Sequence, residues 1–125
     1  MNALPLRFFG LAVFLAIVGM AVGIYMGIAE DHTLAPAHAH NNLVGWVTMA
    51  LYGLYYKAVP VAGQSRLAQA HFWLAAAGAV TMGVGIALTT QGVAVVAIVA
   101  SLLVIAAMIL FAWIVWTYRA GLRLA

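Results

Sequence analysis

The sequence contains no cysteine among its 125 residues and little charge, with five Lys and Arg against two Asp and Glu. The absence of cysteine excludes disulfides, thiolate-bound zinc, iron–sulfur clusters and covalently attached haem. Five basic residues spread along the chain are too few for a nucleic-acid-binding surface, so no nucleic-acid partner is expected. Any bound metal must therefore use histidine, methionine, carboxylate or backbone oxygen, and any haem must be held non-covalently.

Polar residues are also scarce, since 68% of the chain is hydrophobic and the mean hydropathy is +1.15. A chain of this size cannot bury so much apolar surface within itself, so the lipid bilayer is its expected solvent. Four hydrophobic stretches, at about 8–29, 37–59, 67–88 and 93–118, are each long enough to span a bilayer. The sequence predicts one all-α domain over residues 1–125, an integral membrane four-helix bundle. The first stretch is longer than the core of a signal peptide and is interpreted as a retained helix.

The basic residues predict the orientation in the membrane. Lys and Arg occur before the first stretch, around the second linker and after the fourth stretch, at Arg7, Lys57, Arg66, Arg119 and Arg123. Because basic residues favour the cytoplasmic side, both termini are predicted to be cytoplasmic and the linker at 30–36 to lie outside. The expected location is a bacterial inner (cytoplasmic) membrane.

Two residue patterns in the hydrophobic stretches suggest packing and interfacial roles. Gly19, Gly23 and Gly27 form a ladder on the first stretch that allows another helix to approach closely, in the same chain or in another. His71 is expected to be an ordinary interfacial histidine. The aromatic residues near the inner ends of the second and fourth stretches are expected to form an interfacial belt: Tyr52, Tyr55, Tyr56, Trp113, Trp116 and Tyr118.

The segment 37–46 carries two of the four histidines at the start of the second stretch. His38 and His40 are two residues apart, a rotation of about 200° on a helix, so they point to nearly opposite sides and suit two separate sites. Polar groups within a membrane segment are functional candidates by default. Imidazole binds haem iron and copper, the amides provide hydrogen bonds, and Gly45 leaves room for a flat macrocycle. The cofactor-binding candidates are His38, His40, Asn41, Asn42, Gly45 and Trp46.

The pattern His38-x-His40, four residues, then Gly45-Trp46 resembles the tenth helix of the catalytic subunit of haem–copper oxidases, closest to the C-type oxidases and their nitric oxide reductase relatives. The resemblance covers about ten residues. It implies that His38 binds a high-spin haem iron and His40 a low-spin haem iron on the other face. That family's copper site uses three more histidines on two other helices, and this sequence has no counterpart to them.

The resemblance implies a haem-binding membrane redox protein, cytochrome-like, with non-covalent b-type haem and a role in electron transport; copper is a second cofactor under consideration. Whether it is an enzyme is left open. The family's twelve helices form three four-helix arcs around a pseudo-three-fold axis, and this chain corresponds to one arc. A homotrimer is therefore favoured, with a dimer next, since one chain is too small to enclose a haem.

Other interpretations remain open at this stage. A membrane protein that handles copper or zinc, or assists oxidase assembly, could use an outer metal site at Glu30, Asp31, His32, His38 and His40. The two histidines could also be interfacial residues without a ligand. A proton-coupled transporter is the least favoured function, because both acids lie in a linker and none lies within a membrane stretch.

Overall fold

The computed structural model describes residues 3–122, and within that range every element of regular structure is helical. Three long helices are α1 (Leu4–Ala29), α5 (Arg66–Thr89) and α6 (Val95–Thr117). Between α1 and α5, three segments follow one another without a break: α2 (Ala35–His40), the π-helix η1 (Asn41–Thr48) and α3 (Met49–Ala58). Two short helices complete the chain, α4 (Pro60–Gly63) and α7 (Arg119–Leu122). The all-α prediction is confirmed for the described residues, and the predicted boundaries lie within a few residues of the observed ones, except at the amino end of α1.

Local sequence signals explain where several helices begin and end. Pro5, Pro36 and Pro60 lie in the first turns of α1, α2 and α4, where a missing N–H costs nothing. Ser65 caps α5, with its hydroxyl accepting a hydrogen bond from the Ala68 amide at 3.1 Å. Gly92 adopts a φ of 82° in the turn between α5 and α6, a conformation that glycine adopts without strain.

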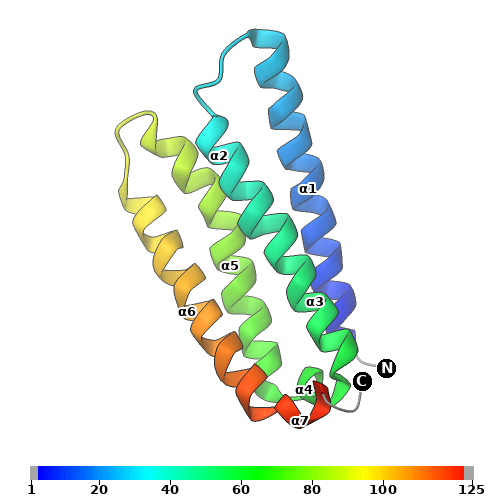
Figure 1. The fold of residues 1–125 in the computed structure, drawn as a ribbon. Helices are drawn as coiled ribbons and strands as arrows, with labels where there is room; N and C mark the ends of the chain where they lie inside the picture. Colours follow the sequence, from blue (N-terminus) through cyan, green and yellow to red (C-terminus); the bar gives the residue numbers. More distant parts are fainter. Residues whose placement is uncertain (1–2, 123–125) are drawn as a thin grey trace.

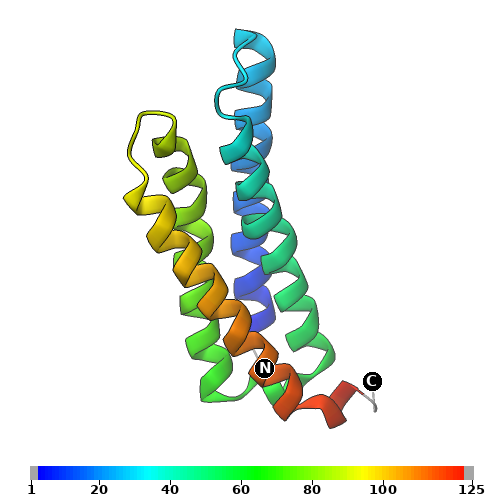
Figure 2. The same cartoon turned by 60° about the vertical axis from the view of Figure 1, so that its left-hand side comes forward.

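The long helices run side by side as two hairpins, one of α1 with α2–η1–α3 and one of α5 with α6 (Figures 1 and 2). Glycines allow α5 and α6 to approach closely. A Cβ at Gly85 would lie 2.8 Å from the Ala97 backbone nitrogen, and one at Gly78 would lie 3.1 Å from that of Val104. Small residues therefore bring these two backbones together, as in other membrane helix pairs.

α1, α5 and α6 are each long and apolar enough to cross a membrane. Large apolar side chains cover much of the outer surface of these helices, which suits contact with lipid. Residues 35–58 run alongside them as one continuous helical stretch, in which the π-helix η1 lies between two shorter α-helical segments. The sequence predicts a regular helix here, and the structure differs by the wide turns of η1.

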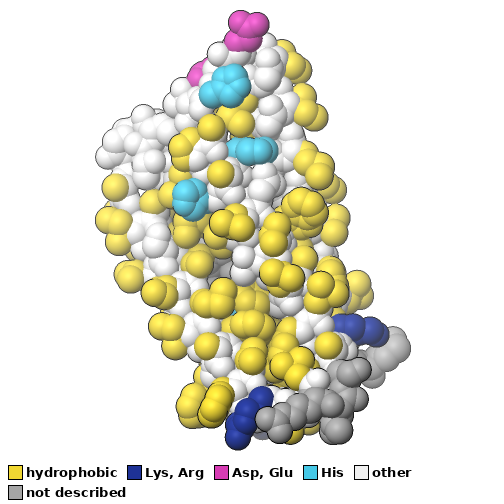
Figure 3. Space-filling model, viewed as in Figure 1, with side chains coloured by type: hydrophobic (Ala, Val, Ile, Leu, Met, Phe, Trp, Pro, Cys, Tyr) yellow, Lys and Arg dark blue, Asp and Glu magenta, His cyan; other side chains and the backbone are white. Residues whose placement is uncertain are grey.

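Charged side chains separate to the two ends of the molecule (Figure 3). We call the end that carries Glu30 and Asp31 the acidic end. The opposite end, which carries Arg7, Lys57, Arg66 and Arg119, is the basic end. Histidine side chains are visible toward the acidic end. Arg123 lies outside the described residues.

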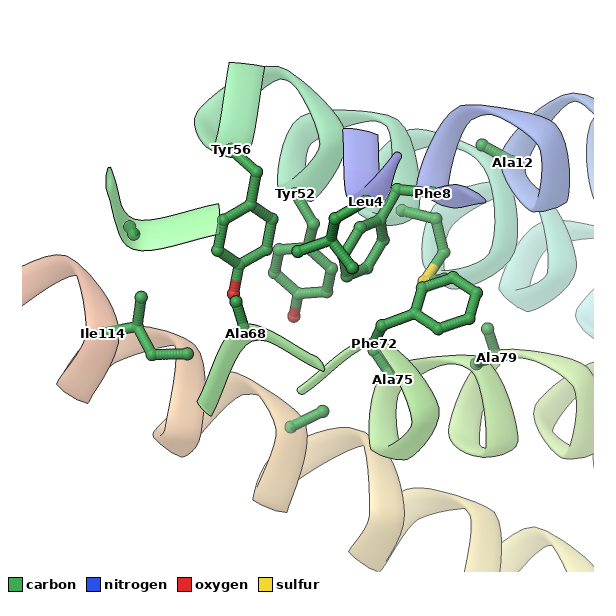
Figure 4. Close-up of a cluster of buried hydrophobic side chains, with 14 of the residues drawn as sticks. Leu4, Phe8, Ala12, Tyr52, Tyr56, Ala68, Phe72, Ala75, Ala79 and Ile114 are labelled. Carbon is green, nitrogen blue, oxygen red and sulfur yellow. The ribbon is translucent and has the colours of Figure 1, made fainter. Parts of the chain in front are cut away.

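An aromatic cluster fills the core near the basic end (Figure 4). Phe8 of α1 stacks on Tyr56 of α3 with ring centroids 5.5 Å apart, and Tyr52 contacts Phe111 of α6 at 4.6 Å. Tyr52 and Tyr56 are buried, so the prediction that they belong to an interfacial belt is wrong for these two residues. Trp113 and Trp116 are exposed, as the belt requires.

Candidate functional site

His38 points from α2 into its interface with α1. Its Nδ1 lies 2.8 Å from the carbonyl oxygen of Gly19. Because a carbonyl oxygen can only accept, Nδ1 carries the hydrogen and donates a hydrogen bond to this oxygen. A Cβ at Gly23 would lie 3.0 Å from Cε1 of His38, so the imidazole occupies the space that this glycine leaves.

Asn42 occupies the second nitrogen of His38. Its amide nitrogen lies 3.2 Å from Nε2, the acceptor nitrogen of the ring, and donates to it. The Asn42 side-chain oxygen lies where a Cβ at Gly19 would be. Both nitrogens of His38 are therefore satisfied within the chain. Iron binding by His38 stays a prediction, and it would require the Asn42 amide to move.

The glycine ladder of α1 is thus used mainly inside the chain. His38 and Asn42 fill the notches at Gly23 and Gly19, whereas a Cβ at Gly27 would meet no atom within 4 Å. Two of the three glycines that the sequence offered for helix packing therefore accommodate polar side chains of the same protein.

His40 points away from this interface and is exposed. Its Nδ1 lies 2.7 Å from the carbonyl oxygen of Pro36, one turn earlier, and therefore donates to it. Nε2 is left as the basic nitrogen, with no hydrogen-bond partner among residues 3–122. An Nδ1–H held by a backbone carbonyl, with Nε2 free, is the usual arrangement of a metal-binding histidine. Of the two histidines in the motif, His40 is the one with a ring nitrogen that has no hydrogen bond to the described residues and could coordinate a metal ion.

Asn41, Gly45 and Trp46 take different positions around η1. Asn41 is buried, and its amide nitrogen donates to the Leu15 carbonyl oxygen at 2.7 Å. Gly45 is also buried, and a Cβ there would lie 2.9 Å from Cδ1 of Leu15, so this side chain already fills the space beside the glycine. Trp46 is exposed. A macrocycle beside Gly45 stays a prediction that would require Leu15 to move.

The wide turns of η1 follow from the spacing of the residues that face α1. Asn41 and Gly45 both contact Leu15 of α1. Gly53, in α3, lies against Phe8 and Phe9, nearer the amino end of α1. In an ideal α-helix the twelve steps from residue 41 to residue 53 turn about 1200°, which is about 120° beyond three full turns. Wider turns reduce this drift and keep all three residues toward α1. Within η1, the Thr48 hydroxyl donates to the Leu43 carbonyl oxygen five residues earlier, at 2.8 Å.

The acidic residues and His32 lie in the exposed loop between α1 and α2. The Thr33 hydroxyl and backbone amide donate to one oxygen of Asp31 at 2.6 and 2.9 Å, and these bonds lower the pKa of Asp31. Within residues 3–122, no group of three or more His, Asp or Glu side chains is close enough to hold one metal ion. The loop acids, His32, His38 and His40 therefore do not converge on one site in a single chain.

His71 lies in the core, so the prediction of an interfacial histidine is wrong. It is fully buried among Phe8, Tyr52, Tyr56 and Phe111, not interfacial. The Tyr56 hydroxyl lies 2.8 Å from its Nδ1, and its Nε2 has no partner in the described part of the chain. Ala68 and Ala75, three residues before and four after, mark a packed helix face and were the available signal.

No family model matches the chain, and comparison with curated proteins and with solved structures gives no match.

Proposed function

We propose that this protein binds haem in the membrane, with Nε2 of His40 as an axial ligand of the iron. The observation that carries the proposal is the free, exposed Nε2 on an imidazole whose Nδ1 is held 2.7 Å from a backbone carbonyl. The His-x-His…Gly-Trp resemblance supports the same residue. The absence of cysteine fits a b-type haem held without covalent links.

The proposal includes four membrane spans with both termini in the cytoplasm. Residues 35–58 supply the second span, since they run unbroken beside the three long helices. All five Lys and Arg belong to the predicted cytoplasmic side in the sequence, and those within the described range lie at the basic end. The location in a bacterial inner membrane follows from the same reasoning and from the family that the motif resembles.

The chain's own residues would hold the haem only from one side. His40 supplies one imidazole, and the helix surface below it is apolar and exposed at Leu43, Val47 and Leu51. The haem, when bound, supplies one-electron redox chemistry. The second axial ligand and the opposite wall must come from another copy or another protein. We propose a homotrimer in which each copy forms one four-helix arc, with the dimer as the alternative closed assembly.

The test of haem binding is the absorption spectrum of the purified protein after reconstitution with haem. Wild type is expected to show a Soret band with sharp low-spin bands on reduction. His40→Gly is expected to lose them, and added imidazole is expected to restore them by entering the space of the missing ring. His32→Gly, at an exposed histidine in the loop, is the matched control and should bind haem normally. A spectrum that survives His40→Gly would overturn the assignment.

Stoichiometry is tested separately by native mass spectrometry in mild detergent. The expected species is a trimer that carries haem and loses it on dissociation. A monomer with full haem occupancy would contradict the shared-site assembly.

A further inference from the structure

A cavity of about 320 Å³ lies between α1, the α2–η1 segment and α5, toward the acidic end. Phe14 and Val18 line it from α1, and Val80 and Val84 line it from α5. These four side chains are exposed on the surface, so the cavity opens sideways between α1 and α5. In a membrane-spanning chain, this opening faces hydrocarbon.

One polar atom in this apolar wall has no partner. Asn41 lines the cavity and is only 7% exposed. Because its amide nitrogen is fixed as the donor to the Leu15 carbonyl, its Oδ1 remains as an acceptor, and no residue in the described range donates to it. Oδ1 lies beside Gly83, where a Cβ would be 3.3 Å away, and Gly83 also lines the cavity. A carbonyl oxygen that faces an apolar cavity without a donor is costly, and a bound hydrogen-bond donor removes that cost.

His38 also lines the cavity, but its ring nitrogens are bonded to Gly19 and Asn42. The acceptor left over in this site is therefore Oδ1 of Asn41, on the same amide whose nitrogen is bonded to the Leu15 carbonyl of α1. The volume is about ten times the ~30 Å³ that one water occupies in the liquid, and the apolar lining disfavours a cluster of waters. The site suits an apolar molecule with one donor at its polar end.

The absence of charged side chains around the cavity restricts the kind of ligand that it can bind. None of the lining residues is Lys, Arg, Asp or Glu, and all Lys and Arg of the described range lie at the basic end. A carboxylate or phosphate would find no cation here, and an ammonium would find no anion. We propose that this cavity binds a neutral, membrane-soluble molecule through a hydroxyl that donates to Asn41 Oδ1, with its apolar body lying between α1 and α5. This inference does not depend on haem binding.

Photo-crosslinking of the full chain in lipid nanodiscs tests the proposal. The probe is an alkylphenol with a diazirine on its tail, and crosslinked residues are mapped by mass spectrometry. Crosslinks are expected on cavity residues of α1 and α5, such as Val18 and Val84. Competition is then measured with 4-octylphenol and with 4-octylanisole, its methyl ether, at equal amounts per lipid. The phenol should displace the probe at an at least about fivefold lower concentration, since only it can donate a hydrogen bond.

Gly83→Val places a side chain over the Asn41 oxygen and should raise the half-displacing phenol concentration about fivefold or more. Gly27→Val, on α1 where a Cβ meets open space, is the matched control and should leave it unchanged. Adding 1-dodecanol distinguishes a chain alcohol from a ring phenol, and displacement by either hydroxyl supports the proposal. Equal displacement of the probe by the phenol and by the ether would overturn it. That result would mean that the cavity holds only lipid acyl chains or water and does not recognise a hydroxyl. Crosslinks confined to other surfaces would overturn it as well.

Discussion

The Tyr56 hydroxyl and Nδ1 of His71 lie 2.8 Å apart in the packed aromatic core. The pair contains two polar hydrogens when both groups are neutral, one on the hydroxyl and one on the imidazole. A single bond uses one of them, so the other is left without a partner in the described part of the chain, whichever tautomer forms. This polar pair joins α3 to α5 near the basic end.

Removal of one member of this pair should therefore destabilise the protein. Tyr56→Phe leaves Nδ1 of His71 buried without a partner and is expected to cost about 1–3 kcal/mol of unfolding free energy. The double variant Tyr56→Phe/His71→Leu should lose less than the sum of the two single variants, because no unpaired group remains. Thermal unfolding in detergent measures both. Tyr25→Phe, at an exposed tyrosine of α1, should change nothing, and an equal loss there would contradict the prediction.

The notch at Gly19 should not tolerate even one methyl group. Gly19→Ala places a Cβ on the Asn42 side-chain oxygen and must push apart the Asn42–His38 arrangement, at about 1–3 kcal/mol for an overpacked contact. Gly27→Ala adds the same methyl in open space and should be neutral or slightly stabilising. The melting temperatures of the two variants in one detergent give the comparison. Similar values would mean that the notch does not hold the two helices together.

Cysteine labelling tests the proposed orientation in the membrane. Thr33→Cys lies in the loop at the acidic end and should react with an impermeant thiol reagent added outside intact cells. Gln64→Cys, exposed between α4 and α5 at the basic end, should react only after the cells are opened. The chain has no other cysteine to interfere. The reverse pattern would show that the positive-inside rule fails for this protein.

The bonds from Thr33 predict a pH effect confined to the loop. They lower the pKa of Asp31, so the folded state favours its carboxylate. This stabilisation is complete above the ordinary pKa of aspartate and is lost as the pH falls through the lowered value. Thr33→Val removes the hydroxyl donor and should bring the pKa of Asp31 back toward its ordinary value. NMR titration of the Asp31 side chain measures the change, and an unaltered pKa would show that the hydroxyl bond is not formed in solution.

The helices could be predicted from sequence because lipid-spanning stretches have a strong hydrophobic signal. The divergent directions of His38 and His40 followed from their spacing alone. His71 and Tyr56 were misplaced because an aromatic residue near a helix end looks the same whether it meets headgroups or a partner helix. Similarly, the spacing of Gly19 and Gly23 predicts a close contact with another helix. Only the folded chain shows that the side chains of Asn42 and His38 make this contact. The π-helix depends on how η1 matches α1, which no local pattern encodes.

The wide turns of η1 give the helical stretch at 35–58 a flexible joint. A π-helix is a rare and less favourable backbone geometry, so bending should concentrate at Asn41–Thr48 and not in the α-helical segments on either side. The segment above this joint carries His38, which grips α1, and His40, which faces outward. A tilt at the joint would move both imidazoles together, because both lie on α2. A ligand or partner that displaces His40 would then also strain the hydrogen bond between His38 and the Gly19 carbonyl, at the interface with α1.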